Sequence, residues 1–315
     1  MSHIVSVCIC THNRSQSLQQ TLNSFASQID INSRRVELLV VDNNCTDSTP
    51  QVIEAFRKRL PIRKVTETRQ GLAYARNRAV VEFQGDVLLF TDDDVRLEPS
   101  WLAAYLDAIR LFPDADFFGG RILPDWGYAK PRWIGDEPLH LIDGLLVWFD
   151  HGAETRLLGT TEPPPFGASF AIRRRLFEKI GLFRTDLGTG GMGLGRGEET
   201  EFLMRARDSR AQGVYVGEAL CFHAYDPRRL TLAALYRYGI ACGRSHNAIV
   251  DRPHRGGYDA AASFIVRGIF QMITGRRDRF RQCIINAGIE TGTRKSVAKE
   301  IREILPRISS RSETP

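Results

Sequence analysis

Three consecutive carboxylates, Asp92, Asp93 and Asp94, follow the apolar run 87–90 and are the residues best suited to chemistry. Such a run is typical of a strand buried on both faces, so the carboxylates would emerge at its C-terminal end, where open α/β sheets bind ligands. Adjacent carboxylates repel one another unless a cation offsets their charge. The Asp92-x-Asp94 spacing therefore favours a divalent cation. The alternative is a solvated acidic turn that caps a helix beginning near 99–101.

Alternating apolar and amphipathic segments predict the elements that position these carboxylates. We expect strands over 4–10, 36–41, 62–66 and 87–90, and helices over 15–27, 48–60 and 72–83. This alternation implies right-handed crossovers and a mostly parallel sheet. The polar residues that follow three of the strands, at 11–14, 42–44 and 92–94, would then meet at one edge and form a nucleotide-sized site.

Beyond residue 113 the periodicity weakens, and prolines and glycines interrupt the chain before a helix expected over 173–180. The glycine-rich segment 186–197 contains a G-x-G-x-x-G match, but no strand precedes it, which argues against a dinucleotide site. We interpret the segment as a mobile loop that delivers Glu198, Glu199 and Glu201.

Composition narrows the functional classes. The 315 residues are 43% hydrophobic, enough to bury a large core. The formal charge is +6, and the basic residues gather late, around 276–281 and 294–299, beside apolar segments. This pattern leaves open nucleic acid, anionic lipid or a merely solvated surface. No apolar stretch approaches the roughly 20 residues of a membrane span, and no secretory signal opens the chain, so we expect a cytoplasmic protein.

The segments 7–14, 40–47, 71–78 and 92–94 together resemble the family 2 glycosyltransferases with their GT-A fold. Residues 166–174 with 180–183 look like the acceptor-side strand and helix of that family, and 197–202 looks like its Gly-Glu-Asp segment. Each motif is weak alone, but their order makes a strong signal. The resemblance implies an α/β fold of GT-A type, with a Rossmann-like, mostly parallel sheet flanked by helices and a helical C-terminal extension. It places a catalytic domain at 1–230, with a nucleotide-binding half at 1–112 and an acceptor-binding half at 113–230, before a basic extension at 231–315.

The resemblance also implies roles for individual residues. Glu199 would be the general base of an inverting transfer, with Glu198 as a substitute because Glu replaces the family's Asp; the alternative is an acidic helix start favoured by the macrodipole. Asp94, Asp92 and His223 would hold Mn²⁺ or Mg²⁺, although His223 could equally be a histidine satisfied within the fold. The nucleotide contacts would be Thr11, Asn13, Arg14, Asp42, Asn44, Gly71, Arg76, Asp92 and Asp93. The acceptor side would contain Gly167, Ala168 and Ser169, with Trp126 and Trp133 as candidates for stacking on a sugar.

The function implied is transfer of a sugar from a nucleotide-diphosphate sugar, a UDP-sugar by preference, to a hydroxyl of a glycan or lipid-linked acceptor in cell-surface polysaccharide or glycolipid assembly. The C-terminal region would contact the inner face of the membrane peripherally. The alternatives are a retaining GT-A enzyme, a nucleotidyltransferase and a nucleic-acid-binding protein. We expect no nucleic-acid partner, because no recognition motif or interleaved aromatic pattern is present.

Overall fold

The computed structural model describes residues 5–28, 36–127, 130–131, 134, 143–190, 196–249, 258–273, 279 and 281–293. The chain divides into two compact units. The first contains residues 1–129, 146–193 and 198–225, and the second contains 130–145, 194–197 and 226–315. The division expected near residue 230 stays a prediction.

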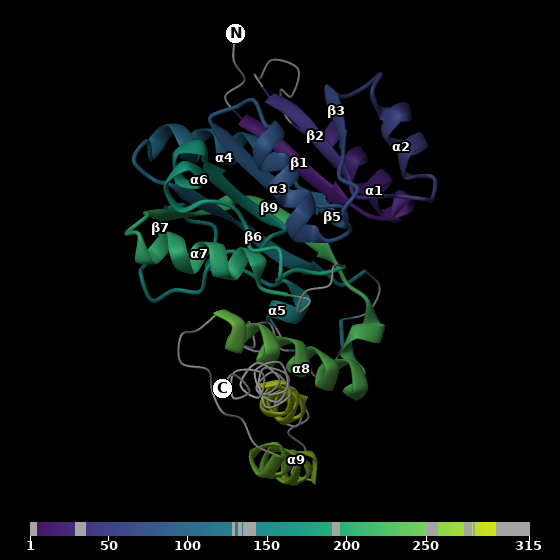
Figure 1. The fold of residues 1–315 in the computed structure, drawn as a ribbon, viewed down its shortest axis with the longest axis vertical. Helices are drawn as coiled ribbons and strands as arrows, with labels where there is room; N and C mark the ends of the chain where they lie inside the picture. Colours follow the sequence, from purple (N-terminus) through teal and green to yellow (C-terminus); the bar gives the residue numbers. More distant parts are fainter. Residues whose placement is uncertain are drawn as a thin grey trace, which may run out of the picture. The chain divides into compact units, whose positions relative to one another are not determined.

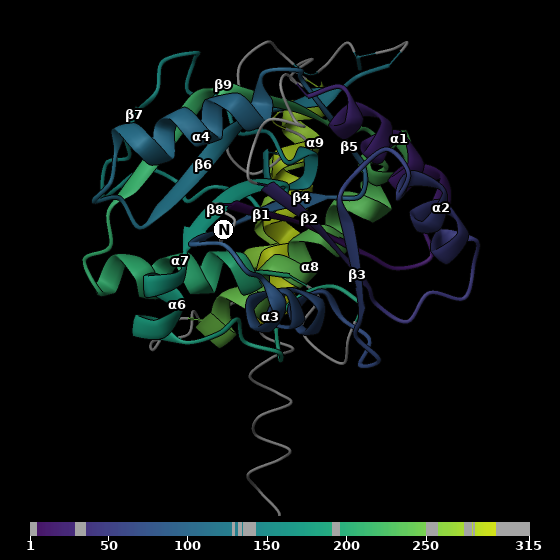
Figure 2. The same ribbon diagram turned by 90° about the horizontal axis from the view of Figure 1, so that it is seen from above.

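The first unit is built on one mixed sheet with the strand order β3-β2-β1-β4-β8-β6-β9-β5, and β7 pairs with β9 (Figures 1 and 2). The strands are β1 (Val5–Thr11), β2 (Val36–Asp42), β3 (Ile62–Thr66), β4 (Val87–Asp92), β5 (Val95–Leu97), β6 (Phe117–Asp125), β7 (Arg156–Leu157), β8 (Ser169–Arg173) and β9 (Gly213–Ala224). The four strands β3, β2, β1 and β4 are parallel, as predicted. β8 then pairs antiparallel with both β4 and β6, in the part of the chain where the sequence periodicity weakened.

The helices of this unit are α1 (Ser15–Ala26), α2 (Thr49–Phe56), α3 (Leu72–Glu82), α4 (Trp101–Leu111), α6 (Arg174–Ile180) and α7 (Glu198–Asp208). Most bounds match the predicted ones closely. α2 is shorter than expected, because 57–60 form a turn ahead of Pro61, and a residue before proline is disfavoured in a helix.

Helices cover both faces of the sheet, and this explains the apolar runs within its parallel strands. Alternate residues of β4 enter two different buried clusters: Val87 and Leu89 join the one that contains α1, α2 and α4, while Leu88 and Phe90 join the one that contains α3, α6 and α7. Figure 2 shows α4 on one side of the sheet and α3, α6 and α7 on the other. A strand buried on both faces has no polar side to expose except at its ends. The polar residues are therefore concentrated at the strand ends.

The second unit is helical in its described C-terminal part, with η2 (Pro227–Leu230), α8 (Leu232–Ile249), α9 (Tyr258–Ile273) and a helical segment over 281–293; a short helix α5 (Asp143–Leu146) lies at the junction of the units in sequence. α8 packs closely on 281–293, since a Cβ added to Gly239 would lie 3.0 Å from the Cα of Gly288. Within the described ranges, no helix is both long and apolar enough to cross a membrane. Much of the predicted basic region, including 276–277 and 294–299, lies outside them.

Candidate active site

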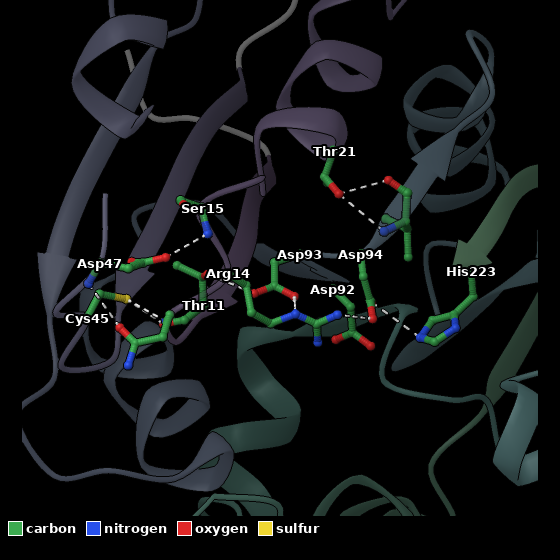
Figure 3. Close-up of polar contacts among 12 residues, drawn as sticks. Thr11, Arg14, Ser15, Thr21, Cys45, Asp47, Asp92, Asp93, Asp94 and His223 are labelled. Atoms are coloured by element: carbon green, nitrogen blue, oxygen red, sulfur yellow. Dashed lines mark hydrogen bonds and ion pairs between the residues drawn. The ribbon is translucent and has the colours of Figure 1, made fainter. Parts of the chain in front are cut away.

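The ends of β1, β2 and β4 bring three predicted polar clusters to one edge of the sheet. The parallel register aligns Thr11 with Asp42 and Cys10 with Asp92. Figure 3 shows Thr11, Arg14 and the three aspartates side by side at this edge. The parallel strands all end here, so segments far apart in sequence supply one site.

Arg14 and Thr11 hold the acidic triplet. Thr11 Oγ1 donates a 2.7 Å hydrogen bond to Asp93 Oδ2. The Arg14 guanidinium lies 2.6 Å from Asp94 Oδ2 and 3.3 Å from Asp93 Oδ1. The side chains of Asp93 and Asp94 are only 6% and 10% exposed. The triplet is therefore a partly enclosed, cation-paired group and not a solvated turn.

Asp92, Asp94 and His223 form a set of donors suited to a metal ion. One ligand atom from each residue can be chosen so that all three lie within 4.8 Å of one another. β5 pairs antiparallel with β9 and sets Val95 opposite His223, so His223 Nε2 lies 3.3 Å from Asp94 Oδ1. Two carboxylates and an imidazole are common ligands of divalent cations in proteins. The donor set fits Mn²⁺, and fits Mg²⁺ through its oxygens.

The predicted nucleotide residues near Asp42 organise the loops that follow β1 and β2. Asn13 and Asn44 adopt the left-handed region, with φ of 51° and 61°, a conformation that asparagine tolerates. Asn13 Oδ1 accepts a 2.7 Å hydrogen bond from the Thr46 amide, and Asp42 Oδ1 accepts one of 2.9 Å from the Cys45 amide. These side chains therefore shape the rim of the site through their own loop.

Two further residues that the sequence reasoning did not single out hold this rim. Asn43 is 3% exposed. Its side-chain Nδ2 donates to the Arg69 carbonyl at 2.7 Å, and its Oδ1 accepts from the backbone amide of Gly71 at 2.9 Å. Asp47 accepts from the amides of Ser15 and Thr49, each at 3.0 Å. Burial acts to raise the pKa of Asp47, but hydrogen bonding by Thr49 and Ser15 outweighs it and lowers the pKa to about 2. An Asn or Asp after a strand or before a helix is a known loop organiser, and that was the available signal.

Arg76, which the resemblance makes a nucleotide contact, is buried beside the acidic start of α7. The residue is 2% exposed, and its Nη1 donates to Glu198 Oε1 at 2.6 Å. Nη1 also lies 3.7 Å from Glu199 Oε2, and Nη2 lies 3.9 Å from Asp92 Oδ1. Burial and the neighbouring Glu199 raise the pKa of Glu198, while Arg76 counteracts them. Sequence and structure thus agree on the acidic start of α7, but its partner is an arginine from α3.

The acceptor-side residues of the sequence prediction are mostly structural in their contacts. Ser169 is 0% exposed, and its Oγ accepts a 3.0 Å hydrogen bond from Trp101 Nε1. The Ala168 carbonyl accepts a 3.0 Å bond from Thr91 Oγ1. A fully buried Ser169 cannot touch an acceptor, so that assignment is corrected. Gly167 packs against the Arg76 guanidinium.

The two tryptophans proposed to stack on a sugar, Trp126 and Trp133, have different outcomes. Trp126 is half-buried, with its ring centroid 6.1 Å from that of Trp148 and 5.2 Å from that of Tyr225. Trp148 is 6% exposed and belongs to the core. Trp133 lies outside the described residues. Tyr225, which follows β9 two residues after His223, is an aromatic neighbour that the sequence reasoning missed.

Asp93 is expected to make stability depend on pH. Burial raises the pKa of its carboxyl from 3.8 to about 7, with Arg14 opposing and Asp94 adding to the shift. The folded protein then binds the proton more tightly than the unfolded chain, so the free energy of unfolding falls as pH rises from about 4 to about 7. Asp93→Asn should flatten this slope in denaturant titrations at several pH values in EDTA. Equal slopes for the two proteins would contradict the assignment.

The profile of glycosyl transferase family 2 matches residues 6–181, more than half of the chain. The chain belongs to glycosyl transferase family 2. The family resemblance inferred from the sequence motifs is thereby confirmed, and the protein is a glycosyltransferase.

This family 2 glycosyltransferase is similar to two relatives that are named as a glucuronosyltransferase and a succinoglycan biosynthesis protein. It is 27% identical to the glucosyl-dolichyl phosphate glucuronosyltransferase of Haloferax volcanii over 191 residues, 59% of this chain and 58% of the relative. It therefore spans little more than half of that relative's length. It is 24% identical to the succinoglycan biosynthesis protein ExoM of Rhizobium meliloti over 302 residues, 91% of this chain and 92% of the relative.

Solved structures establish the fold of this glycosyltransferase. The mannosyltransferase PcManGT from Pyrobaculum calidifontis, in complex with GDP-Man and Mn²⁺, matches with a TM-score of 0.62 at 17% identity, over 93% of this chain and 87% of that chain. Residues 1–349 of Staphylococcus aureus TarS in complex with UDP-GlcNAc match with a TM-score of 0.55 at 15% identity, over 89% and 90%. The predicted GT-A fold is confirmed.

Proposed function

We propose that this glycosyltransferase moves a sugar from a UDP-sugar to an acceptor hydroxyl with inversion at the anomeric carbon and with the help of Mn²⁺ or Mg²⁺. One observation carries the proposal. The acidic start of α7 and the metal-type donor set face the same Arg76 guanidinium, which lies 3.7 Å from Glu199 and 3.9 Å from Asp92. A base and a leaving-group site beside one another are what a single-displacement transfer requires.

The donor would bind at the edge formed by β1, β2 and β4. Thr11, Asn13 and Asp42 would line the base and ribose side, and Arg14 the diphosphate side. Asp92, Asp94 and His223 would hold the metal ion, which when bound offsets the charge that develops on the leaving diphosphate. The GDP-Man and Mn²⁺ in PcManGT and the UDP-GlcNAc in TarS support a nucleotide sugar here.

Glu199 would act as the general base. Its side chain is 18% exposed, whereas that of Glu198 is 3% exposed and engaged with Arg76. Glu199 would accept the proton of the acceptor hydroxyl as that oxygen bonds to the anomeric carbon. The bond from this carbon to the diphosphate oxygen breaks on the opposite face, and its electron pair leaves with the diphosphate. General-base assistance of this kind contributes roughly 10²–10⁴-fold.

The acceptor would be a glycan or a lipid-linked sugar, used at the cytoplasmic face of a membrane. The names of two relatives, a glucosyl-dolichyl phosphate glucuronosyltransferase and a succinoglycan biosynthesis protein, support this class. In the second unit, Ile265 and Val266 of α9 are 42% and 66% exposed. An apolar helix surface of this kind suits a peripheral lipid contact.

The donor and the stereochemistry can be tested together. Purified protein is incubated with UDP-, GDP- and dTDP-sugars with EDTA, Mg²⁺ or Mn²⁺, and the anomeric configuration of the product is read by NMR. We expect one UDP-sugar to be consumed only with metal and the product to be inverted. A retained configuration would refute Glu199 as base, consumption of another nucleotide would refute the UDP assignment, and no consumption of any donor would refute the function.

A further inference from the structure

Arg76 is unusual for an arginine, because phenylalanine rings surround its guanidinium group. Its Cζ lies 5.4 Å from the ring centroid of Phe170, 5.8 Å from that of Phe90 and 6.0 Å from that of Phe183. Burial alone would lower the pKa of Arg76, but Glu198, Glu199 and Asp92 outweigh it and the pKa is raised. The guanidinium is therefore a permanent charge that water does not screen.

The backbone leaves room for this group at Gly167. A Cβ at that position would lie 2.9 Å from Arg76 Cζ and closer still to Nη2. The turn that contains Gly167 is itself fixed to β4, since Thr91 Oγ1 donates to the Ala168 carbonyl at 3.0 Å. The guanidinium is therefore packed against a turn that is held to β4.

A second tie joins α3 to the segment that precedes α7. The Leu72 amide, at the start of α3, donates to the Thr189 carbonyl at 2.9 Å. Beside it, a Cβ at Gly188 would lie 3.3 Å from the Ala73 nitrogen and 3.3 Å from Glu198 Oε2. The helix that carries Arg76 is therefore packed directly against the Glu198 carboxylate.

The planar Arg76 guanidinium thus lies beside carboxylates of two elements, α7 with the proposed base and β4 with the proposed metal ligands. Nη1 bonds Glu198 at 2.6 Å, next to Glu199 on α7, and Nη2 faces Asp92 at the end of β4. Arginine fixes such an arrangement because its nitrogens lie in a rigid fork, whereas lysine offers one point charge on a flexible stem.

We propose that Arg76 is a positioning residue that fixes the base Glu199 at a set distance from the metal-ligand end of β4, with Glu198 as its anchor on α7. The inference rests on the proposed function. In this role, Arg76 contacts neither the sugar nucleotide nor the acceptor. Its removal should slow transfer without weakening donor binding, because a misplacement of about 1 Å can cost on the order of 100-fold in rate.

The test compares Arg76→Lys with native protein, Glu199→Gln and a matched control, Arg174→Lys. Arg174 is the first residue of α6 and follows the end of β8 that is farther from Gly167 in the chain. Its guanidinium donates to the carbonyls of Phe83 and Gly85 at 2.8 Å and stacks on the ring of Phe83. Transfer kcat, donor KM, Mn²⁺-dependent UDP binding and thermal unfolding are measured for each. We expect Arg76→Lys to lose about 10- to 100-fold in kcat with donor KM and UDP binding within about threefold of native, and Arg174→Lys to keep its kcat.

Each other result is decisive. Native kcat in folded Arg76→Lys, alongside an inactive Glu199→Gln, would overturn the positioning role and leave the proposed function standing. A parallel rise in donor KM and UDP dissociation constant would make Arg76 a nucleotide contact and also overturn the inference. An inactive native protein would instead be a failure of the proposed function. If Arg76→Lys does not fold, Gly167→Ala, which keeps the charge and displaces the guanidinium, must show the same split, and unchanged kcat there would overturn the role.

Discussion

Replacing Glu199 by Gln should reduce sugar transfer by roughly 10²–10⁴-fold while the sugar nucleotide and metal ion still bind. Glutamine has nearly the same shape as glutamate, but its amide cannot accept the acceptor proton. Glu199 is also the more accessible of the two acids, with 18% of its side chain exposed against 3% for Glu198. The measurement is steady-state transfer with the consumed donor, together with UDP binding by calorimetry.

Glu201→Gln is the matched control for this variant. Glu201 lies in the same first turn of α7 but pairs with Arg205 at 2.7 Å, away from Arg76. We expect its transfer rate to remain near that of native protein. If Glu199→Gln turns over normally and Glu198→Gln does not, the base assignment is reversed. If both variants are active, neither Glu198 nor Glu199 is the base.

Replacing Arg76 by Met should destabilise the protein by about 3–5 kcal/mol. The change leaves Glu198 buried without its 2.6 Å partner and leaves Glu199 and Asp92 without the nearby positive charge. Urea unfolding monitored by circular dichroism would show a lower midpoint with a similar slope.

A second substitution separates the lost charge pairing from lost packing. Glu198→Leu in the Arg76→Met background should recover part of the stability, because an apolar pair avoids a buried unpaired carboxylate. A single variant with the native midpoint would show that the ion pair contributes nothing to folding. Failure of the double variant to recover any stability would point to packing against Phe170 and Phe90 as the cause.

The sequence revealed the parallel half of the sheet because helices cover both of its faces. That burial produces the continuous apolar runs of β1, β2 and β4, and it confines polar residues to the strand ends. Thr11, Asp42 and Asp92 could be placed at one edge on this basis alone. The antiparallel insertion of β8 could not, because a five-residue strand after an irregular segment carries little periodicity.

The partner of Arg76 also could not be predicted from the sequence. The motif around 71–78 indicated a functional arginine, but Glu198 lies 122 positions further along the chain. Only the packing of α3 against α7 decides whether the side chain points to the rim or inward. Ser169 failed for a related reason, since a polar residue at a strand start can serve a buried tryptophan as well as a substrate.

Metal dependence at Asp94 tests the central claim most directly. Transfer from the consumed sugar nucleotide is measured as a function of Mn²⁺ concentration for native protein and for Asp94→Asn, after EDTA treatment and with folding checked for both. The account predicts that native activity is absent in EDTA and restored by Mn²⁺, and that the variant is not restored at any Mn²⁺ concentration that saturates the native protein. Undiminished native transfer in EDTA, or full Mn²⁺-dependent activity in the variant, would contradict it.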